Sequence, residues 1–137
     1  MSKKQEFLDK VKNGTISAQD LFLMLDVMEE LSANNADIKE LLEDLKDEDD
    51  IIINFKVNDK EAAFMIIKGK LSVQRGLHPN PTVKITMDKP TALGILTHKI
   101  SMMGAYKEGK IIAEGKLIKL AGLAILMNIV GDELGII

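Results

Sequence analysis

The side chains that most often carry out catalysis are scarce in this sequence. Cysteine is absent, and the two histidines, His78 and His98, lie in different predicted elements. Catalysis by the chain's own residues requires a nucleophile beside a base, paired carboxylates in a cleft, or a cluster of metal ligands. The sequence has none of these groupings. We therefore expect that the protein is not an enzyme, and we assign no catalytic residue and no metal ligand.

Two segments superficially resemble ligand-binding motifs. Residues 109–116 read GKIIAEGK, but five residues separate the two glycines, and Leu117 stands where a phosphate-binding loop requires Ser or Thr. The acidic run of Asp44 and Asp47–Asp50 lacks the alternating oxygen ligands, central glycine and terminal Glu of a calcium loop. We therefore reject the phosphate loop and interpret the acidic run as a solvated linker.

Charge is divided unevenly along the chain. Residues 1–50 contain 6 Lys and 14 Asp or Glu, a net charge of −8. Residues 51–137 contain 12 Lys or Arg and 7 Asp or Glu, a net charge of +5. Two interpretations stay open: the two parts complement each other, or a basic face meets anionic lipid headgroups. A nucleic-acid partner is not expected, because no dense basic stripe is interleaved with aromatic residues.

The sequence also bears on the compartment. The charged start, Met1–Glu6, is not followed by the apolar segment of a secretory signal, and the lack of cysteine fits a reducing environment. The longest apolar stretch, Leu120–Val130, is far shorter than the roughly 20 residues that span a bilayer. We expect a cytoplasmic location.

Hydrophobic spacing divides the chain into an N-terminal helical extension, residues 1–47, and a domain at residues 48–137. In the extension, apolar residues at helical spacing predict three helices. The first ends at Asn13–Gly14, the second begins with Ser17 as its N-cap and runs to about Leu31, and the third follows Asn34 and Asn35.

From Ile51 the hydrophobic period changes to two, which indicates strands. We expect strands at about 51–57, 62–67, 71–74, 83–87 and 110–115, the first three in an antiparallel meander. Asp88 is expected to cap a helix, and residues 100–104 to form a link or a second short helix. The predicted fold is α+β, with a five-stranded, mainly antiparallel sheet covered by helices.

The last predicted helix, at about 117–130, is apolar almost all round, interrupted only by Lys119, Gly122 and Asn128. An ordinary surface helix has one apolar stripe of about 100° or somewhat more. We therefore expect this helix to be covered on nearly all sides. The N-terminal helices, a partner subunit or a bound lipid are the three candidates for that cover.

Two stretches resemble the sterol carrier protein 2 (SCP2) domain. They are PNPTVKITM at 79–87, before a helix, and GKIIAEG at 109–115, before the closing apolar helix. The resemblance covers residues 51–130 with the elements in the same order. It implies helices packed on a five-stranded sheet, with an apolar tunnel between them that binds fatty acids, acyl-CoA, phospholipids or sterols.

The resemblance therefore implies a lipid-binding or lipid-transfer protein. A bound lipid is expected in place of a cofactor. Lys107, Lys110, Lys116 and Lys119 lie near the expected tunnel mouth, where they either attract a headgroup or only keep the surface soluble. The residues that we expect to line the tunnel are Phe55, Phe64, Ile66, Ile85, Met87, Leu96, Met103, Tyr106, Leu120, Leu123, Ala124 and Met127.

Two other functions stay open. One is an accessory protein that presents an isoprenoid or quinone-type lipid to an enzyme. The other is an interaction module that binds no ligand and covers its apolar helix by forming a homodimer. The expected partners are thus a lipid or fatty acid, an anionic membrane in transient contact and, in the last alternative, a second copy of the chain.

Overall fold

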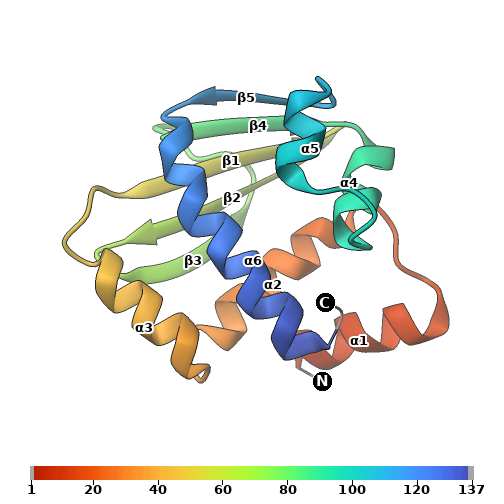
Figure 1. The fold of residues 1–137 in the computed structure, drawn as a ribbon, viewed down its shortest axis with the longest axis horizontal. Coiled ribbons are helices and arrows are strands. Elements are labelled where there is room, and N and C mark those ends of the chain that lie inside the picture. The colour runs from red at the N-terminus through yellow and green to blue at the C-terminus, as the bar shows by residue number, and fades with distance from the viewer. Residues whose placement is uncertain (1, 136–137) are drawn as a thin grey trace.

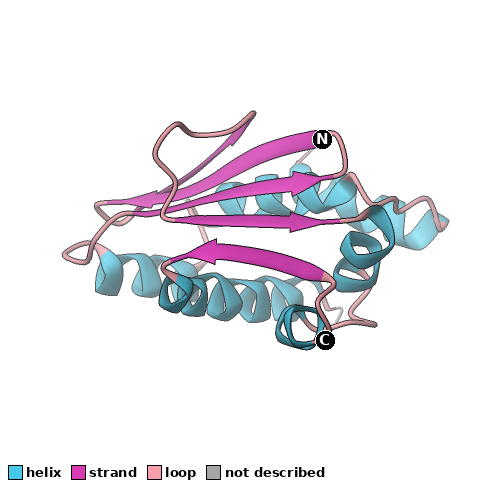
Figure 2. Ribbon diagram, turned by 90° about the horizontal axis from the view of Figure 1, so that it is seen from above, coloured by secondary structure: helices cyan, strands magenta, loops and turns pink. Residues whose placement is uncertain are grey.

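The helices lie on one face of a five-stranded sheet (Figures 1 and 2). The computed structural model describes residues 2–135. In chain order its elements are α1 (Lys3–Asn13), α2 (Asp20–Leu31), α3 (Ala36–Leu45), β1 (Ile51–Val57), β2 (Lys60–Ile67), β3 (Lys70–Arg75), β4 (Val83–Met87), α4 (Lys89–Leu96), α5 (Met102–Lys107), β5 (Ile111–Gly115), the 3-10 turn η1 (Leu117–Lys119) and α6 (Leu120–Leu134).

The strand order is β3-β2-β1-β4-β5. Only β1 and β4 run parallel to each other, and the other three pairs are antiparallel. The predicted five-stranded, mainly antiparallel sheet with a meander of the first three strands is therefore confirmed. The short turns after β1 and β2 join these strands as hairpins. The connection from β3 to β4, residues 76–82, instead passes over β2 and β1, because β4 pairs with the far side of β1.

One hydrophobic core fills the space between the sheet and the helices. Alternate residues of each strand point into it, as Ile53 and Phe55 of β1 do, and both are buried. Helix α2 contributes Val27 and Met28 to the same core, also buried. The predicted boundary between residues 47 and 48 falls between α3 and β1, and the elements on both sides of it share this core.

Side-chain caps mark where several helices begin. Asp88 accepts a hydrogen bond from the Thr91 N–H at 2.9 Å, as predicted. Of the two candidate caps Asn34 and Asn35, it is Asn35 that accepts one from the Ile38 N–H, at 3.0 Å. The prediction for Ser17 is wrong, because α2 begins only at Asp20. Residues 17–19 form a turn, and the Asp20 carboxylate accepts a hydrogen bond from the Ser17 N–H at 2.8 Å.

Helix α2 is tied to the edge strand β3. Arg75 donates two hydrogen bonds to the Asp26 carboxylate, at 3.1 and 2.7 Å. The Glu29 carboxylate accepts a third from the Val73 N–H at 2.7 Å. A strand edge otherwise offers unpaired N–H groups to other chains. Side chains of α2 therefore occupy part of the outer edge of β3.

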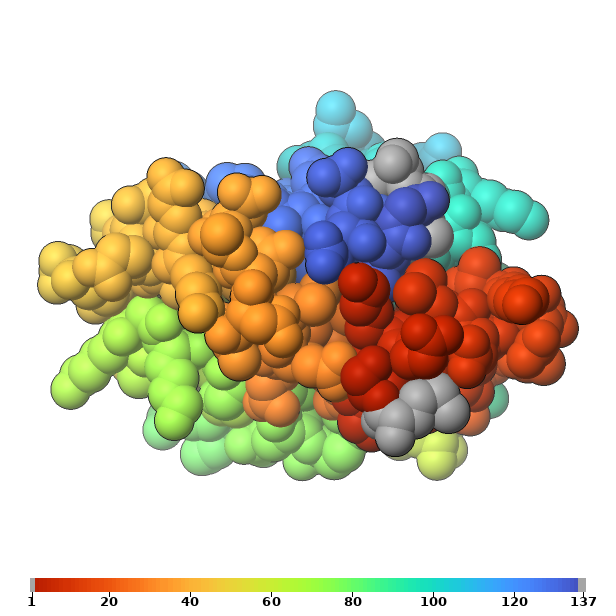
Figure 3. Space-filling model, turned by 90° about the horizontal axis from the view of Figure 1, so that it is seen from below, coloured from red at the N-terminus to blue at the C-terminus, as the bar shows by residue number. Residues whose placement is uncertain are grey.

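Helix α6 crosses the helical face of the sheet, where it contacts α2 and α3 (Figure 1). Figure 3 shows its surface between the N-terminal helices, drawn in red and orange. An ion pair between Lys4 and Glu133, at 3.3 Å, joins its last turn to α1. None of the helices within residues 2–135 has the length and apolar content that a membrane crossing requires.

The sheet and the N-terminal helices leave part of the last helix exposed, and cover of that part by a partner subunit or a bound lipid stays a prediction. Leu123, Leu126 and Val130 are buried, but Ile125 is 48% exposed, and Ile118 in the preceding 3-10 turn is 83% exposed. The sheet and the N-terminal helices contact one side of α6 only, so its opposite side stays open. A strip of apolar surface thus remains uncovered in the single chain.

Candidate functional site

A groove of about 280 Å³ opens between α5 and α6, and we call it the α5–α6 groove. Its deepest residue is Ile85 of β4, which is only 1% exposed, so the groove reaches from the surface to the helical face of the sheet. The residues that line it are Ile85, Met102, Met103, Tyr106, Ile111, Ala113, Leu117, Ile118, Leu120, Ala121 and Ala124.

The walls of the groove follow from the local geometry of each element. In β5, Ile111 and Ala113 face the helices because strand side chains alternate, which leaves Ile112 on the other face. On α6, Leu120 and Ala124 are one turn apart and share a face. The small side chains of Ala113 and Ala124 leave room between the strand and the helix.

Gly115 joins β5 to the turn that leads into α6. Its φ is +113°, and an added Cβ would lie 2.2 Å from the carbonyl oxygen of Thr82. Both the backbone conformation and the close approach of the two strands require glycine here. The position of η1, and with it one wall of the groove, depends on this residue.

The lining is almost entirely apolar. Tyr106 supplies a side-chain hydroxyl, and the other lining residues have no side-chain oxygen or nitrogen. Such a surface holds an apolar molecule by excluding water and imposes little directional selectivity. The arrangement suits binding of an apolar ligand better than acid–base chemistry.

Four lysines adjoin groove-lining residues in the sequence. Lys107, Lys110, Lys116 and Lys119 each neighbour a lining residue in the sequence, at the ends of α5, β5 and η1. Lys110 also pairs with Glu108 at 3.2 Å. Lys107 and Lys119 thus end α5 and η1, and Lys110 and Lys116 directly precede β5 and η1.

Two titratable side chains near β4 have local hydrogen-bond partners. Hydrogen bonds from Thr91 lower the pKa of the Asp88 carboxyl, as expected for a helix N-cap. His78 accepts a hydrogen bond from the Asn80 N–H through Nδ1 at 3.0 Å, in the turn before β4. Within residues 2–135, no three His, Asp or Glu side chains are grouped closely enough to hold a metal ion.

The predicted tunnel residues are distributed over three regions. Ile85, Met103, Tyr106, Leu120 and Ala124 line the α5–α6 groove. A small void of about 10 Å³ is lined in part by Leu96 and Met127. The remaining five are buried in the packed core, and their contact with a ligand stays a prediction: Phe55, Phe64, Ile66, Met87 and Leu123.

Sequence reasoning missed six residues of the groove. The small side chains of Ala113 and Ala121 were the one feature of the sequence that could have indicated a space between β5 and α6. The exposed wall at Ile118 depends on the 3-10 turn before α6, which the hydrophobic pattern does not reveal. The missed residues are Met102, Ile111, Ala113, Leu117, Ile118 and Ala121.

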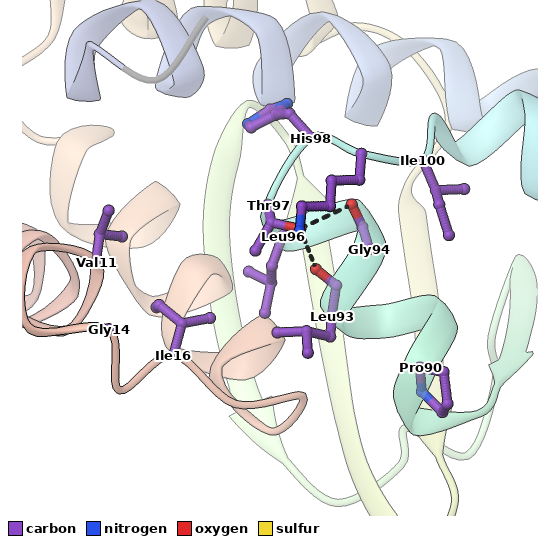
Figure 4. A pocket seen from close by; sticks show the side chains of 11 residues that line it. Val11, Gly14, Ile16, Pro90, Leu93, Gly94, Leu96, Thr97, His98 and Ile100 are labelled. Carbon is purple, nitrogen blue, oxygen red and sulfur yellow. Dashed lines mark hydrogen bonds between the residues drawn. The ribbon is translucent and has the colours of Figure 1, made fainter.

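A second and larger pocket, of about 640 Å³, lies between α1 and α4, and we call it the α1–α4 pocket. Val11, Gly14 and Ile16 line one side, and α4 with the loop after it lines the other (Figure 4). Its lining also includes His98, whose φ of 58° places it in the left-handed region.

Comparison with known proteins identifies the fold. No protein-family model matches the sequence, and no curated protein matches it. Among solved structures, the chain is similar to a UbiJ-SCP2 ubiquinone synthesis protein, with a TM-score of 0.60 and 6% identity over 80% of this chain and 88% of that one. It is also similar to sterol carrier protein 2 from Yarrowia lipolytica in its apo form, with a TM-score of 0.56 and 18% identity over 77% and 88%.

A third similarity is to part of a much larger enzyme. A double mutant of the sec-alkyl sulfatase PisA1 matches with a TM-score of 0.51 and 26% identity over 56% of this chain. The chain spans only 13% of the length of that sulfatase. The similarities to the two SCP2 structures show that the chain has the SCP2 fold, as the motifs at 79–87 and 109–115 predicted.

Proposed function

We propose that the protein binds a lipid, with the apolar chain of the lipid in the α5–α6 groove. The observation that carries the proposal is an apolar groove that reaches buried Ile85 between the sheet and the helices of an SCP2 fold. Each methylene group removed from water contributes about 0.8 kcal/mol, so a chain gains affinity without specific polar contacts.

The size of the groove favours a slender ligand. Its volume of about 280 Å³ is near the lower end of the range of about 300–1,000 Å³ for ligand pockets. A single acyl or prenyl chain suits such a space better than a bulkier fused-ring sterol does. Fatty acids, acyl-CoA and phospholipids are therefore the ligand classes that we put first.

The surroundings of the groove favour an anionic headgroup and contact with an anionic membrane. Met103, Tyr106 and Ile118 line the groove and are exposed, and lysines adjoin the latter two in the sequence. Exposed apolar residues grouped with basic ones are typical of surfaces that touch anionic bilayers. A ligand exchanged at such a contact enters the groove without crossing open water.

The same exposed surface supports a second candidate function. One similar structure is described as a ubiquinone synthesis protein, and an apolar rim around a lipid site also suits docking of an enzyme that acts on the lipid. In this alternative the protein presents an isoprenoid or quinone-type lipid. A homodimer that buries Ile118 and Ile125 without a ligand is the third alternative.

Native mass spectrometry of the purified protein, followed by organic extraction and lipid identification, tests the proposal. We expect one lipid per chain, and its class separates acyl from isoprenoid ligands. A protein with no bound lipid, which also fails to bind a fluorescent fatty acid, contradicts the proposal. If no lipid binds and the measured mass is that of a dimer, the homodimeric interaction module without a ligand is favoured.

A further inference from the structure

One face of α6 connects the α5–α6 groove with the interior of the protein. Leu120, Ala124 and Met127 lie at helical spacing on this face. The first two line the groove, and Met127 lines the small void of about 10 Å³. The groove and the void are thus separated by about one helical turn, roughly 5 Å along the axis.

The void in turn shares two residues with the α1–α4 pocket. Leu96 and His98 line both spaces, so their side chains form a common wall. Figure 4 places His98 on the side of the pocket that faces α6. The three spaces therefore follow one another from α5, past Met127 and Leu96, to α1.

The side chains that interrupt this path are adaptable. Met24, Met28 and Met127 surround the void. Methionine is unbranched and has three rotatable side-chain bonds, so it changes shape without moving the backbone. Joining the three spaces requires rotation of these side chains and of Leu96, which lie between them.

The α1–α4 pocket is lined mainly by apolar residues, and Thr97, His98 and Lys99 are the polar side chains of its lining. Val11 and Ile16 face Leu93 and Leu96 across it (Figure 4). Val11 is 44% exposed and Leu93 is 37% exposed, which leaves apolar surface uncovered in the single chain. Thr97, the hydroxyl-bearing residue of the lining, already donates a hydrogen bond to the Leu93 carbonyl at 2.8 Å.

We infer that the α1–α4 pocket is a second compartment of the lipid site, which receives the distal end of a chain too long for the α5–α6 groove. This inference rests on the proposed function. The ligand class is an elongated single-chain lipid, with its headgroup beside the lysines near the groove and its tail between Met127 and Leu96. Helix α1 then forms one wall of the lipid site.

The test compares chain lengths. Saturated fatty acids of about eight to about twenty carbons compete with a fluorescent fatty acid for the wild-type protein and for Val11→Trp and Leu96→Trp. Val11→Trp fills the pocket from an exposed position, so the variant is expected to fold normally, whereas Leu96→Trp blocks the path. Lys12→Trp is the matched control, because Lys12 is exposed on the same helix and lines none of the three spaces.

We expect the wild-type affinity to rise across the whole series. In Val11→Trp the affinity should stop rising at intermediate chain length. For longer chains it should fall below the wild-type affinity by about tenfold for every two methylenes that the variant leaves unburied. Short chains should bind all variants within about twofold. A length profile in Val11→Trp identical to that of Lys12→Trp overturns the second compartment but leaves the proposed function standing. Failure of every fatty acid to compete overturns the proposed function itself.

Photolabelling provides an independent measurement on the wild-type protein. A long-chain fatty acid with a photoreactive group at its methyl end should label residues between 11 and 16 or between 93 and 100. Labelling confined to α5 and α6 contradicts the inference. So does the binding of two long-chain molecules per protein in native mass spectrometry, because one ligand is expected to span both compartments.

Discussion

The side chain of Asn54 forms two hydrogen bonds with the backbone of His78. Its Nδ2 donates to the His78 carbonyl at 3.0 Å, and its Oδ1 accepts from the His78 N–H at 2.9 Å. Asn54 is buried on the face of β1 opposite the helices. The pair therefore fixes the connection that crosses from β3 to β4, and with it the parallel pairing of β1 and β4 that positions Ile85 under the groove.

Replacement of Asn54 by Leu should destabilise the protein. The change leaves the N–H and carbonyl of His78 without their partner, which costs about 1–3 kcal/mol in the free energy of unfolding. Urea denaturation followed by circular dichroism measures the loss. Gln74→Leu, at an exposed position of β3, is the control and should change stability by less than about 0.5 kcal/mol. Equal effects in the two variants would contradict the role assigned to Asn54.

Replacement of Gly115 by Ala should cost more stability than the same change at Gly109. Both glycines have positive φ, but an added Cβ at Gly115 lies 2.2 Å from a backbone oxygen, whereas nothing lies within 4 Å of one at Gly109. We expect a loss of about 1–2 kcal/mol at Gly109 from the left-handed conformation alone, and a larger one at Gly115. Thermal melts of the two variants measure both losses. The Gly115→Ala variant should have the lower melting temperature, because β5 approaches Thr82 closely at this residue.

Replacement of Ala124 by Phe should block the α5–α6 groove. Ala124 is on the exposed side of α6, so the larger side chain can enter the groove without disturbing the buried residues Leu123 and Leu126. We expect at least a tenfold loss of affinity for a fluorescent fatty acid, equivalent to about 1.4 kcal/mol, with little change in melting temperature. Ala36→Phe, on the exposed start of α3, is the matched control. Unchanged affinity in Ala124→Phe would place the lipid elsewhere.

Neutralising Lys116 and Lys119 should weaken binding to anionic vesicles. A basic residue near a membrane surface contributes about 1 kcal/mol to such binding. Lys116→Gln together with Lys119→Gln should thus lower partitioning into phosphatidylserine-containing vesicles roughly 30-fold. Added salt should weaken wild-type binding in the same direction. A matched double change on the acidic N-terminal part, Lys12→Gln with Lys39→Gln, should have little effect, and an equal loss there would indicate attraction by net charge alone.

The sequence was sufficient for the elements whose pattern is set locally. The strands follow an apolar period of two, and the caps at Asn35 and Asp88 depend on contacts three residues away. Ser17 was misassigned because Ser and Asp at that spacing fit two arrangements, and the turn at 17–19 places the helix start at Asp20. Local pattern alone does not choose between them.

The groove was only partly predictable, because it depends on which elements meet. The expected residues that line the groove, such as Ile85 and Tyr106, belong to the β4 and α5 segments that face α6, and their contact with a lipid stays a prediction. Phe55 and Phe64 were expected at a tunnel surface but are packed within the core. Apolar alternation predicts that a side chain faces the helices, but it does not distinguish a packed interior from a space left by neighbouring alanines.

The contact between α2 and α6 also determines when the protein can fold during synthesis. Helix α2 leaves the ribosome before α6, which is one of the helices that contact it and lies about 90 residues later in the chain. Contacts between such distant segments slow folding and leave apolar residues such as Met28 exposed while the chain grows. Because α6 also forms a wall of the α5–α6 groove, a nascent chain that stops before Leu120 lacks this wall, and its groove is incomplete.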